Sequence, residues 1–441
     1  MAGSSSATRR RWRVFASVRA RPEAGADRLF AHSTYDTVVI GAGPAGATAA
    51  ALVAEGGHRV LLLERDTFPR FKIGESLMPA CGEVLGRLGL VDRLQTSHFP
   101  KKFSVQFFSP SGQASSPFYF SEVECARHPQ TWQVLRSEFD QLMADNARAK
   151  GAEVHHGVSV RDVLFEGDRA VGVRGRGPGG EAWEVGARVV VDATGQNALL
   201  ARKLDLQEDD PNLRNASIFT HFAGGVRDPG RDEGATLILH TTHQRSWFWS
   251  IPLPDDRVSI GLVAPQDYLV RPPKRPPQQV FEEELAQCPG LLPRLEGARQ
   301  VMPVQVLRDF TYKARRRAGD GWVLVGDAYG FVDPLYSSGV LLALKSGELA
   351  ADAICQGLSD GDLSGDRLGA FEGSFLRGME AIRKLVYAFY DPDFSFARFL
   401  KRHPQYKDAL VRILIGDVFR DDVDDLFVPM AEMVELPEAW T

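Results

Sequence analysis

Apolar and polar positions follow a regular order near the beginning of this chain. Residues 35–64 contain an apolar run that ends at Ile40, a glycine-rich turn, an alanine-rich segment, and a second apolar run that ends at Leu63. Short apolar runs bounded by glycines indicate buried strands, so this order predicts a strand, a loop, a helix and a second strand. The pattern is typical of an open parallel sheet covered by helices.

The glycine-rich turn has the spacing of a dinucleotide-binding loop. Gly41, Gly43 and Gly46 form a G-x-G-x-x-G pattern between the predicted strand and helix. The first glycine allows a tight turn, the second lets the backbone approach a pyrophosphate, and the third lets the helix pack closely. The helix N-terminus offers free N–H groups to phosphates. Glu64, at the tip of the second strand, would accept a hydrogen bond from a ribose hydroxyl. The loop alone does not distinguish FAD from NAD.

A polar loop after Glu64 carries the G-E-S sequence of residues 74–76 and leads into a predicted helix over residues 80–94. Lys101 and Lys102 then begin a strand with period 2, so one of the two points inward. From the residue pattern alone, a solvated lysine pair is the more common interpretation.

Three further residues are candidates for contact with a dinucleotide. Arg136 follows a short strand and begins a helix, where it either reaches a pyrophosphate or ribose or lies on the surface. Asp192 and Asp327 each end a later apolar run. Because ligands bind at the carboxyl ends of the strands in an open parallel sheet, we expect both carboxylates near the cofactor.

From about residue 217 to residue 262 the pattern changes to the alternation of an antiparallel, β-rich region. Within it, period 2 places Trp247 and Trp249 on one face, followed by Ile251, and Pro252 ends the strand. Two tryptophans on a sheet face are more often core than functional.

Small residues precede a predicted helix that begins near Val340. Pro334, Ser337, Ser338 and Gly339 leave backbone N–H groups exposed at the helix N-terminus, which is a ready anion site. From residue 366 onward the sequence is helical and aromatic, which predicts a helical cap with an apolar inner face.

Composition and charge exclude several classes of protein. The 441 residues are 44% hydrophobic, enough for two cores, and the net charge of −5 gives no basic field for nucleic acid. The four cysteines lie far apart, which favours free thiols in a reducing, cytoplasmic compartment. His240 and His243 have no third ligand nearby in the sequence, so no metal is proposed. No apolar run of membrane-spanning length occurs.

Four separated motifs together resemble the FAD-dependent halogenases, relatives of the aromatic hydroxylases in the glutathione-reductase-like class. The motifs are the Gly41 loop, the G-E-S sequence, the W-x-W-x-I-P box of residues 247–252 and the F-x-x-P-x-x-S-x-G box of residues 331–339. The glycine loop and the Gly326-Asp327 pair are common to the whole superfamily and indicate FAD. The last two boxes carry the resemblance to halogenases, which covers about residues 35–354.

The resemblance implies an α/β fold in three parts. A Rossmann-like FAD-binding domain (residues 35–105, 130–205 and 300–360) is interleaved with an antiparallel β-rich substrate domain (residues 106–129 and 206–299), and a helical C-terminal cap covers residues 361–441. Residues 1–34 contain six arginines before the first acidic residue and are expected to be a disordered basic extension. An organelle transit peptide would look similar.

The resemblance also implies a set of cofactor-binding residues. They are Gly41, Gly43, Ala45, Gly46, Glu64, Arg65, Gly74, Glu75, Ser76, Arg136, Asp192, Gly326, Asp327 and Ser337.

In the family's chemistry, a separate reductase supplies FADH₂ and O₂ gives a flavin hydroperoxide. Chloride or bromide attacks that hydroperoxide to give hypohalous acid, which travels through a tunnel to the substrate. The N–H groups of Ser338 and Gly339 match the halide site. Lys102 matches the tunnel lysine, which holds hypohalous acid or forms a haloamine. With this match, a functional lysine is favoured over the solvated lysine pair that the residue pattern alone indicates. The implied tunnel and substrate residues are Trp247, Trp249, Ile251, Pro252, Phe331, Pro334 and Tyr336.

One position departs from the tryptophan-specific halogenases. They carry a glutamate beside the first serine of the F-x-x-P-x-x-S-x-G box, and this chain has Tyr336 there. We therefore expect an electron-rich phenol or pyrrole, in some cases bound to a carrier protein, rather than tryptophan. Two alternatives stay open at this stage: a flavin monooxygenase or prenyl-reductase-like enzyme that acts directly at the flavin, and a non-catalytic flavoprotein.

Overall fold

The computed structural model describes residues 29–122, 128–269, 275–308 and 311–440. Residues His32–Thr441 form one compact unit. The predicted basic extension lies mostly outside the described residues. Its end was placed too late, because the first strand, β1, already begins at Thr34.

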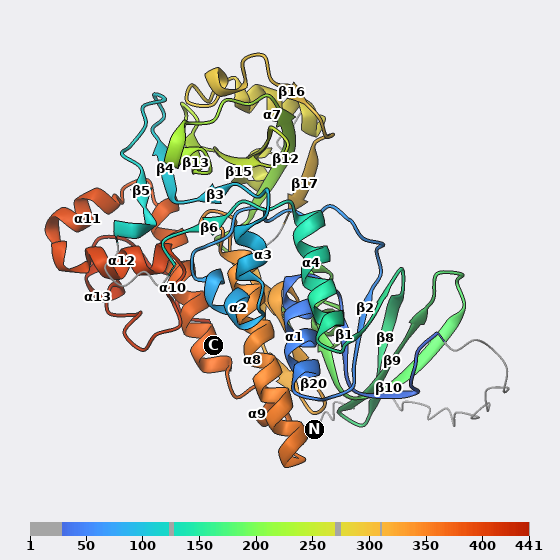
Figure 1. Cartoon of the computed structure of the whole chain (residues 1–441). Helices are drawn as coiled ribbons and strands as arrows, with labels where there is room; N and C mark the ends of the chain where they lie inside the picture. Colours follow the sequence, from blue (N-terminus) through green and yellow to red (C-terminus); the bar gives the residue numbers. More distant parts are fainter. Residues whose placement is uncertain (1–28, 123–127, 270–274, 309–310, 441) are drawn as a thin grey trace, which may run out of the picture. The chain divides into compact units, whose positions relative to one another are not determined.

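A mixed sheet of eight strands forms the first layer (Figure 1). Five strands run parallel: β1 (Thr34–Ile40), β2 (Val60–Glu64), β7 (Glu153–His156), β10 (Ala182–Asp192) and β20 (Trp322–Leu324). Antiparallel strands extend it: β8 (Ser159–Glu166), β9 (Arg169–Arg176) and β19 (Ala318–Gly319). Helix α1 (Pro44–Glu55) packs between α4 (Arg136–Ala149) and α8 (Ser338–Asp360). The central strands are apolar and buried toward their carboxyl ends, over residues 38–40 of β1, 60–63 of β2 and 189–191 of β10, as expected where both faces of a parallel sheet are covered.

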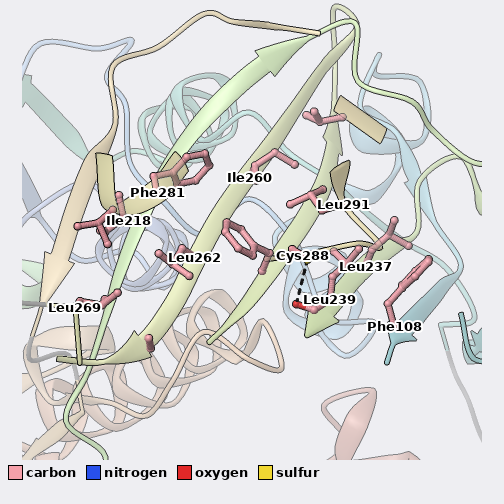
Figure 2. Packing of buried hydrophobic residues seen from close by; sticks show 14 of the residues in the cluster. Phe108, Ile218, Leu237, Leu239, Ile260, Leu262, Leu269, Phe281, Cys288 and Leu291 are labelled. Atoms are coloured by element: carbon pink, nitrogen blue, oxygen red, sulfur yellow. Dashed lines mark hydrogen bonds between the residues drawn. The ribbon is translucent and has the colours of Figure 1, made fainter. Parts of the chain in front are cut away.

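The second layer is a sheet of eight strands that is antiparallel except where β13 pairs with β4. Its strands are β4 (Ser104–Phe108), β5 (Phe118–Tyr119), β12 (Asn215–Ala223), β13 (Thr236–His240), β14 (Trp247–Leu253), β15 (Arg257–Pro265), β16 (Arg299–Gln300) and β17 (Gln305–Arg308). One face packs against α7 (Pro277–Leu285) through a cluster that includes Phe248, Ile260, Leu262 and Phe281 (Figure 2). Because side chains alternate along β14, Trp247, Trp249 and Ile251 lie on the opposite face.

Short elements connect the two sheets. The predicted helix over residues 80–94 is two helices, α2 (Cys81–Arg87) and α3 (Val91–Gln95), because Gly89 has φ +75° between them. Strand β3 (Lys101–Lys102) pairs with β6 (Thr131–Trp132). The remaining elements are β11 (Gln207–Asp209), β18 (Tyr312–Ala314), β21 (Gly330–Phe331), α5 (Leu199–Lys203) and α6 (Gln266–Leu269).

The C-terminal part is helical, as predicted (Figure 1, red). It consists of α9 (Gly365–Leu368), α10 (Glu372–Tyr390), α11 (Phe396–Arg402), α12 (Lys407–Leu414) and α13 (Phe427–Met430). The buried face of α10 is mostly apolar, with Phe375, Met379 and Leu385 among its residues, and it also holds the ion pair of Glu380 and Arg383. None of the described helices has the length and apolar character needed to cross a membrane. The α/β fold class and the helical cap are therefore confirmed.

Candidate active site

One large cavity of about 990 Å³ follows the carboxyl ends of the parallel strands. The loop after β1, the end of β2, the G-E-S segment, the start of α4 and the loop before α8 all contribute to its wall. Twelve of the fourteen predicted cofactor residues line it: Gly41, Gly43, Ala45, Glu64, Arg65, Gly74, Glu75, Ser76, Arg136, Gly326, Asp327 and Ser337. Its size suits an extended ligand larger than a typical drug molecule.

Each of the three glycines in the loop is suited to its position for a different physical reason. Gly41 has φ +102°, and a Cβ there would lie 2.3 Å from the carbonyl oxygen of Ala193. A Cβ on Gly46 would lie 1.9 Å from the carbonyl oxygen of Gly41, so this glycine permits close packing at the loop and does not itself line the cavity. A Cβ on Gly43 would have Arg70 Nη2, 3.9 Å away, as its nearest atom. Its side is therefore open for a phosphate.

Glu64 holds the loop as well as facing the cavity. Its Oε2 accepts from Ala42 N at 3.0 Å, and its Oε1 accepts from Asp66 N at 3.0 Å. Arg70, which no sequence motif indicated, lies 3.5 Å from Glu64 and 2.7 Å from Asp140. Because a carboxylate oxygen accepts more than one hydrogen bond, Glu64 retains capacity for a ribose hydroxyl.

Arg136 lines the cavity but has partners within the protein. Its Nε and Nη2 donate to the two carboxylate oxygens of Asp140 at 2.8 and 3.0 Å, and its Nη1 donates to Ile73 O at 2.6 Å. Arg136 therefore fastens the G-E-S segment to α4 in addition to any contact with a ligand.

Asp192, which we predicted to be a cofactor residue, is not among the residues that line the cavity. Its carboxylate is fully buried and accepts from Thr194 N at 3.0 Å and Leu200 N at 2.7 Å. Asp192 shapes the loop whose residues Thr194 and Gly195 do line the cavity.

Asp327 lies in a short 3-10 turn (Gly326–Ala328) just after β20 and lines the cavity. Burial raises its pKa to about 6, and the positive charge of Arg136 opposes that rise. No hydrogen bond from another described residue reaches this carboxylate. It is therefore available to a ligand hydroxyl, as predicted from its position at the strand tip.

The loop before α8 presents unpaired amides. Ser337 is the N-cap and has φ +58°, a conformation that non-glycine residues rarely adopt. Within the described part of the chain, no oxygen accepts from the N–H groups of Ser338 or Gly339. Gly339 lines the cavity, whereas the Ser338 side chain is buried. A Cβ on Gly339 would lie 2.8 Å from the ring of Phe331.

Lys102 points inward and Lys101 points outward, so the alternation predicted for this pair is confirmed. Lys102 is only 2% exposed. Its Nζ donates to Ser76 Oγ at 2.9 Å and to Leu77 O at 3.3 Å. Burial lowers its pKa to about 7. Burial also raises the pKa of the neighbouring Cys81 thiol to about 12, so Cys81 is a neutral neighbour.

Lys102 also lines a second, small cavity of about 30 Å³, here named the lysine chamber. Room of this size holds about one or two water molecules. The lysine chamber and the large cavity share Thr236, Leu335 and Ser337 as wall residues. The other wall residues of the chamber are Met78, Pro79, Val105, Phe107, Phe118, Tyr336 and Leu414.

The predicted tunnel residues separate into two groups. Trp249, Ile251, Phe331 and Pro334 line the large cavity, and Tyr336 lines the lysine chamber. Trp249 lies directly over Gly261, where a Cβ would be 2.0 Å from the indole ring. The tryptophan therefore requires a glycine on the adjacent strand.

Trp247 and Pro252 lie outside both cavities. The Nε1 of Trp247 donates to the hydroxyl of Tyr390, on the cap helix α10, at 3.0 Å. Pro252 pairs with Val258, a member of the core cluster, so it faces away from Trp249 and Ile251. Neither of these two predicted tunnel residues contributes to the wall of either cavity.

The burial of Lys102 has a measurable consequence for stability. In the unfolded chain this lysine keeps its proton up to about pH 10.5, and in the folded protein only up to about pH 7. Between these values the unfolded state binds more protons, so the contribution of Lys102 to stability rises with pH. Lys102→Met should therefore raise the free energy of unfolding by an amount on the order of a few kcal/mol at low pH, and by less as the pH increases above about 7.

Urea denaturation of both proteins at about pH 6 and about pH 9 tests this expectation. An equal gain in the free energy of unfolding at both pH values would show that removal of the buried charge does not cause the gain.

The sequence matches the tryptophan halogenase family over residues 36–133 and 122–398. A chlorinase from Pseudomonas fluorescens, which acts on 1H-pyrrole-2-carbonyl attached to a peptidyl-carrier protein, is 30% identical over 92% of this chain and 94% of its own length. A brominase from Pseudoalteromonas luteoviolacea with the same named substrate is 33% identical over 88% of this chain and 93% of its own length.

Solved structures give the same result. The flavin-dependent brominase Bmp2 superimposes with a TM-score of 0.81 at 31% identity, covering 90% of this chain and 98% of its own. The myxobacterial chondrochloren halogenase CndH superimposes with a TM-score of 0.76 at 32% identity, covering 90% of this chain and 92% of its own. The chain therefore belongs to the tryptophan halogenase family of flavin-dependent halogenases.

Proposed function

We propose that this protein chlorinates or brominates an electron-rich ring of the pyrrole or phenol class that is attached to a carrier protein. It would use FADH₂ from a separate reductase, together with O₂ and halide. The observation that carries the proposal is a buried lysine in an apolar chamber that shares part of its wall with the large cavity.

The large cavity has the groups that FAD requires. Gly43 leaves an open approach for the pyrophosphate, and Glu64 and Asp327 offer carboxylates for sugar hydroxyls. The unpaired amides of Ser338 and Gly339 begin a long helix, so their partial positive charge favours an anion such as halide. When bound in its reduced form, FAD would react with O₂ and supply the oxidant that converts halide to hypohalous acid.

The side chains that line the two cavities then determine which groups hypohalous acid reaches. Trp249 and Ile251 form part of the wall of the large cavity, on the face of β14 opposite the core cluster. Lys102 lies in the lysine chamber with one nitrogen that donates as an ammonium and accepts a halogen as an amine. A pKa near 7 keeps both forms populated at neutral pH, which suits either role.

The lysine chamber favours a neutral ring over a free amino acid. Apart from Lys102, its described wall carries no residue that is charged at neutral pH, and burial raises the pKa of Tyr336 so that its phenol stays neutral. A free amino acid would bury its ammonium and carboxylate there without partners, which is costly. A ring carried as a carrier-protein thioester has neither charge, and both relatives named above act on 1H-pyrrole-2-carbonyl attached to a peptidyl-carrier protein.

The chamber as observed is smaller than an aromatic ring, so part of its wall must move when a substrate enters. Leu414, at the end of α12, contributes to this wall from the cap. Two neighbours of Leu414, Val411 and Ile415, pack with Phe120 in a small separate cluster. The cap is therefore the part of the wall that we expect to move.

The product assay for this function uses purified protein, chemically supplied FADH₂, O₂ and bromide. Pyrrole, phenol and indole acids are offered free and as carrier-protein thioesters, and products are read by mass. We expect the bromine isotope pair on the carrier-bound pyrrole or phenol. Bromination confined to free tryptophan would contradict the substrate assignment, and no bromination of any ring would contradict the function.

The proposed halide site predicts the effect of Gly339→Pro. Proline removes one N–H donor from the start of α8, so the bromide concentration needed for half-maximal product should rise about tenfold or more. Gly339→Ala is the matched control, because its Cβ meets the Phe331 ring at the same place but keeps the N–H. If both variants raise the required bromide concentration equally, the contact with the Phe331 ring and not the loss of the N–H causes the rise. If neither variant raises it, the halide site lies elsewhere.

A further inference from the structure

Thr236 lies in the wall between the large cavity and the lysine chamber. It is the first residue of β13, is buried, and lines both spaces. Its Oγ1 lies 3.0 Å from Ser76 Oγ, and Ser76 Oγ in turn accepts from Lys102 Nζ at 2.9 Å. A chain of hydrogen bonds therefore leads from Lys102 through Ser76 to Thr236.

Gln133 fixes the far end of this chain. Its Nε2 donates to Gly234 O and to Thr236 Oγ1, both at 2.9 Å. Because a carbonyl oxygen only accepts, the amide nitrogen and not the amide oxygen must face Gly234. Thr236 therefore accepts from Gln133 and keeps its own proton and its remaining lone pair for other partners, of which Ser76 is one.

The two hydroxyls serve Lys102 in both of its protonation states. An ammonium only donates, so charged Lys102 donates to Ser76, and Ser76 donates to Thr236. A neutral amine has a lone pair, so the direction reverses and runs from Thr236 through Ser76 to Lys102. Gln133 donates to Thr236 in both cases.

No carboxylate takes part in this arrangement. Among the described residues, the hydrogen-bond acceptors of Lys102 Nζ are Ser76 Oγ and Leu77 O. The nearby titratable groups are the Cys81 thiol of α2 and, across the chamber, the Tyr336 phenol before α8. Burial raises the pKa of both, so neither supplies a charge at neutral pH. The groups that support the ammonium are therefore the hydroxyl pair, the Leu77 carbonyl and the ring of Phe120, whose centroid lies 5.5 Å from Nζ.

We propose that Thr236 is a positioning residue for Lys102: together with Ser76 it holds the lysine nitrogen toward the lysine chamber and connects it, for proton transfer, with the large cavity. The inference rests on the proposed function, because an ammonium must release a proton before it can take a halogen. The amine and hypohalous acid then give a haloamine and water. When the haloamine passes its halogen to a ring carbon, the N–halogen and C–H bonds break, the C–halogen bond forms, and the ring proton returns to nitrogen.

The test compares Thr236→Val, which keeps the shape and removes the hydroxyl, with Thr236→Ser, which keeps the hydroxyl. The first measurement needs no flavin, halide or ring. Cyanate, a small electrophile, carbamylates only the neutral amine of Lys102, and the extent is read by peptide mass spectrometry across a pH series. The second measurement is product formed per FADH₂ oxidised, with carrier-bound pyrrole-2-carboxylate and bromide.

Hydrogen bonds from the ammonium of Lys102 are stronger than those of its neutral amine. Loss of the hydrogen bonds that run through Ser76 and Thr236 should therefore disfavour the ammonium. The midpoint of carbamylation should therefore move to lower pH in Thr236→Val and stay unchanged in Thr236→Ser. Product per FADH₂ should fall about tenfold in Thr236→Val and recover in Thr236→Ser. Should Thr236→Val not fold, Ser76→Ala removes the middle hydroxyl and should move the carbamylation midpoint the same way and further.

The outcomes separate this inference from the proposed function. An unchanged carbamylation midpoint in the variant that lacks the hydroxyl overturns the positioning role, whatever the product assay gives. Equal losses of product in Thr236→Val and Thr236→Ser also overturn it, because the hydroxyl would then not be the cause. If the original protein forms no halogenated ring, the proposed function fails, while the cyanate series still decides the role of Thr236.

Discussion

Lys102→Ala is expected to abolish halogenated product while FADH₂ is still oxidised at the original rate. The side chain lies in the lysine chamber and not in the wall of the large cavity. Its hydrogen bond to a predicted flavin residue goes to Ser76, which keeps Thr236 as a partner when the lysine is lost. It removes the one described nitrogen in the chamber that donates to hypohalous acid or accepts its halogen. A positioned group of this kind contributes roughly two to four orders of magnitude in rate. The measurement is product formed per FADH₂ oxidised.

Lys101 supplies the matched control for this experiment. It is the neighbouring residue in the same short strand, but its side chain is exposed. Lys101→Ala should therefore keep full product. Lys102→Arg should fail like Lys102→Ala, because a guanidinium keeps its proton and cannot accept a halogen. If Lys101→Ala loses product and Lys102→Ala does not, the wrong lysine has been assigned; if neither loses it, no lysine mechanism operates.

Gly43→Asp is expected to remove flavin from a protein that still folds. The nearest atom to a Cβ at this position is 3.9 Å away, so the fold accommodates a side chain. The added carboxylate would point toward the space where the loop receives a pyrophosphate. Like charges about 4 Å apart repel by roughly 1 to 4 kcal/mol, depending on the local dielectric, which weakens flavin binding by roughly five- to a thousandfold.

The control for this prediction is Gly43→Ala, which adds bulk without charge. Flavin affinity is measured by fluorescence titration, and folding by the urea midpoint. We expect the alanine variant to lose much less affinity than the aspartate variant. Wild-type affinity in a folded Gly43→Asp protein would refute the assignment of this loop to the pyrophosphate.

The parts of the site that could be predicted from the sequence are those carried by short-range patterns. Gly41, Gly43 and Glu64 belong to one strand–loop–helix–strand unit, so their positions follow from local geometry. Ser338 and Gly339 follow from the small residues at a helix start. For Lys102, period 2 showed that one lysine of the pair faces inward, but which one depended on pairing with β6, about thirty residues further along the chain.

Two features of the site follow from local patterns in the sequence. Strict alternation from Trp249 and Ile251 already places Pro252 on the opposite face of β14. The i,i+4 spacing of Arg136 and Asp140 on one helix already predicts their ion pair.

Other features could not be predicted from the sequence, because they depend on contacts between distant segments. Ser76, Lys102, Gln133 and Thr236 come from four separate parts of the chain and meet only in the folded protein. Asp192 shares the strand-tip position of Asp327, yet the backbone of the following loop takes up its oxygens. Only the folded loop distinguishes these two aspartates.

Oxidation at the flavin should end in a carbon–halogen bond and not in a hydroxylated ring. The most direct measurement is the mass of the product formed from the carrier-bound pyrrole-2-carbonyl thioester, FADH₂, bromide and isotopically heavy O₂. We expect the bromine isotope pair, no heavy oxygen in the product, and no product without halide. A ring that gains heavy oxygen, with or without bromide, would contradict this expectation and identify a monooxygenase.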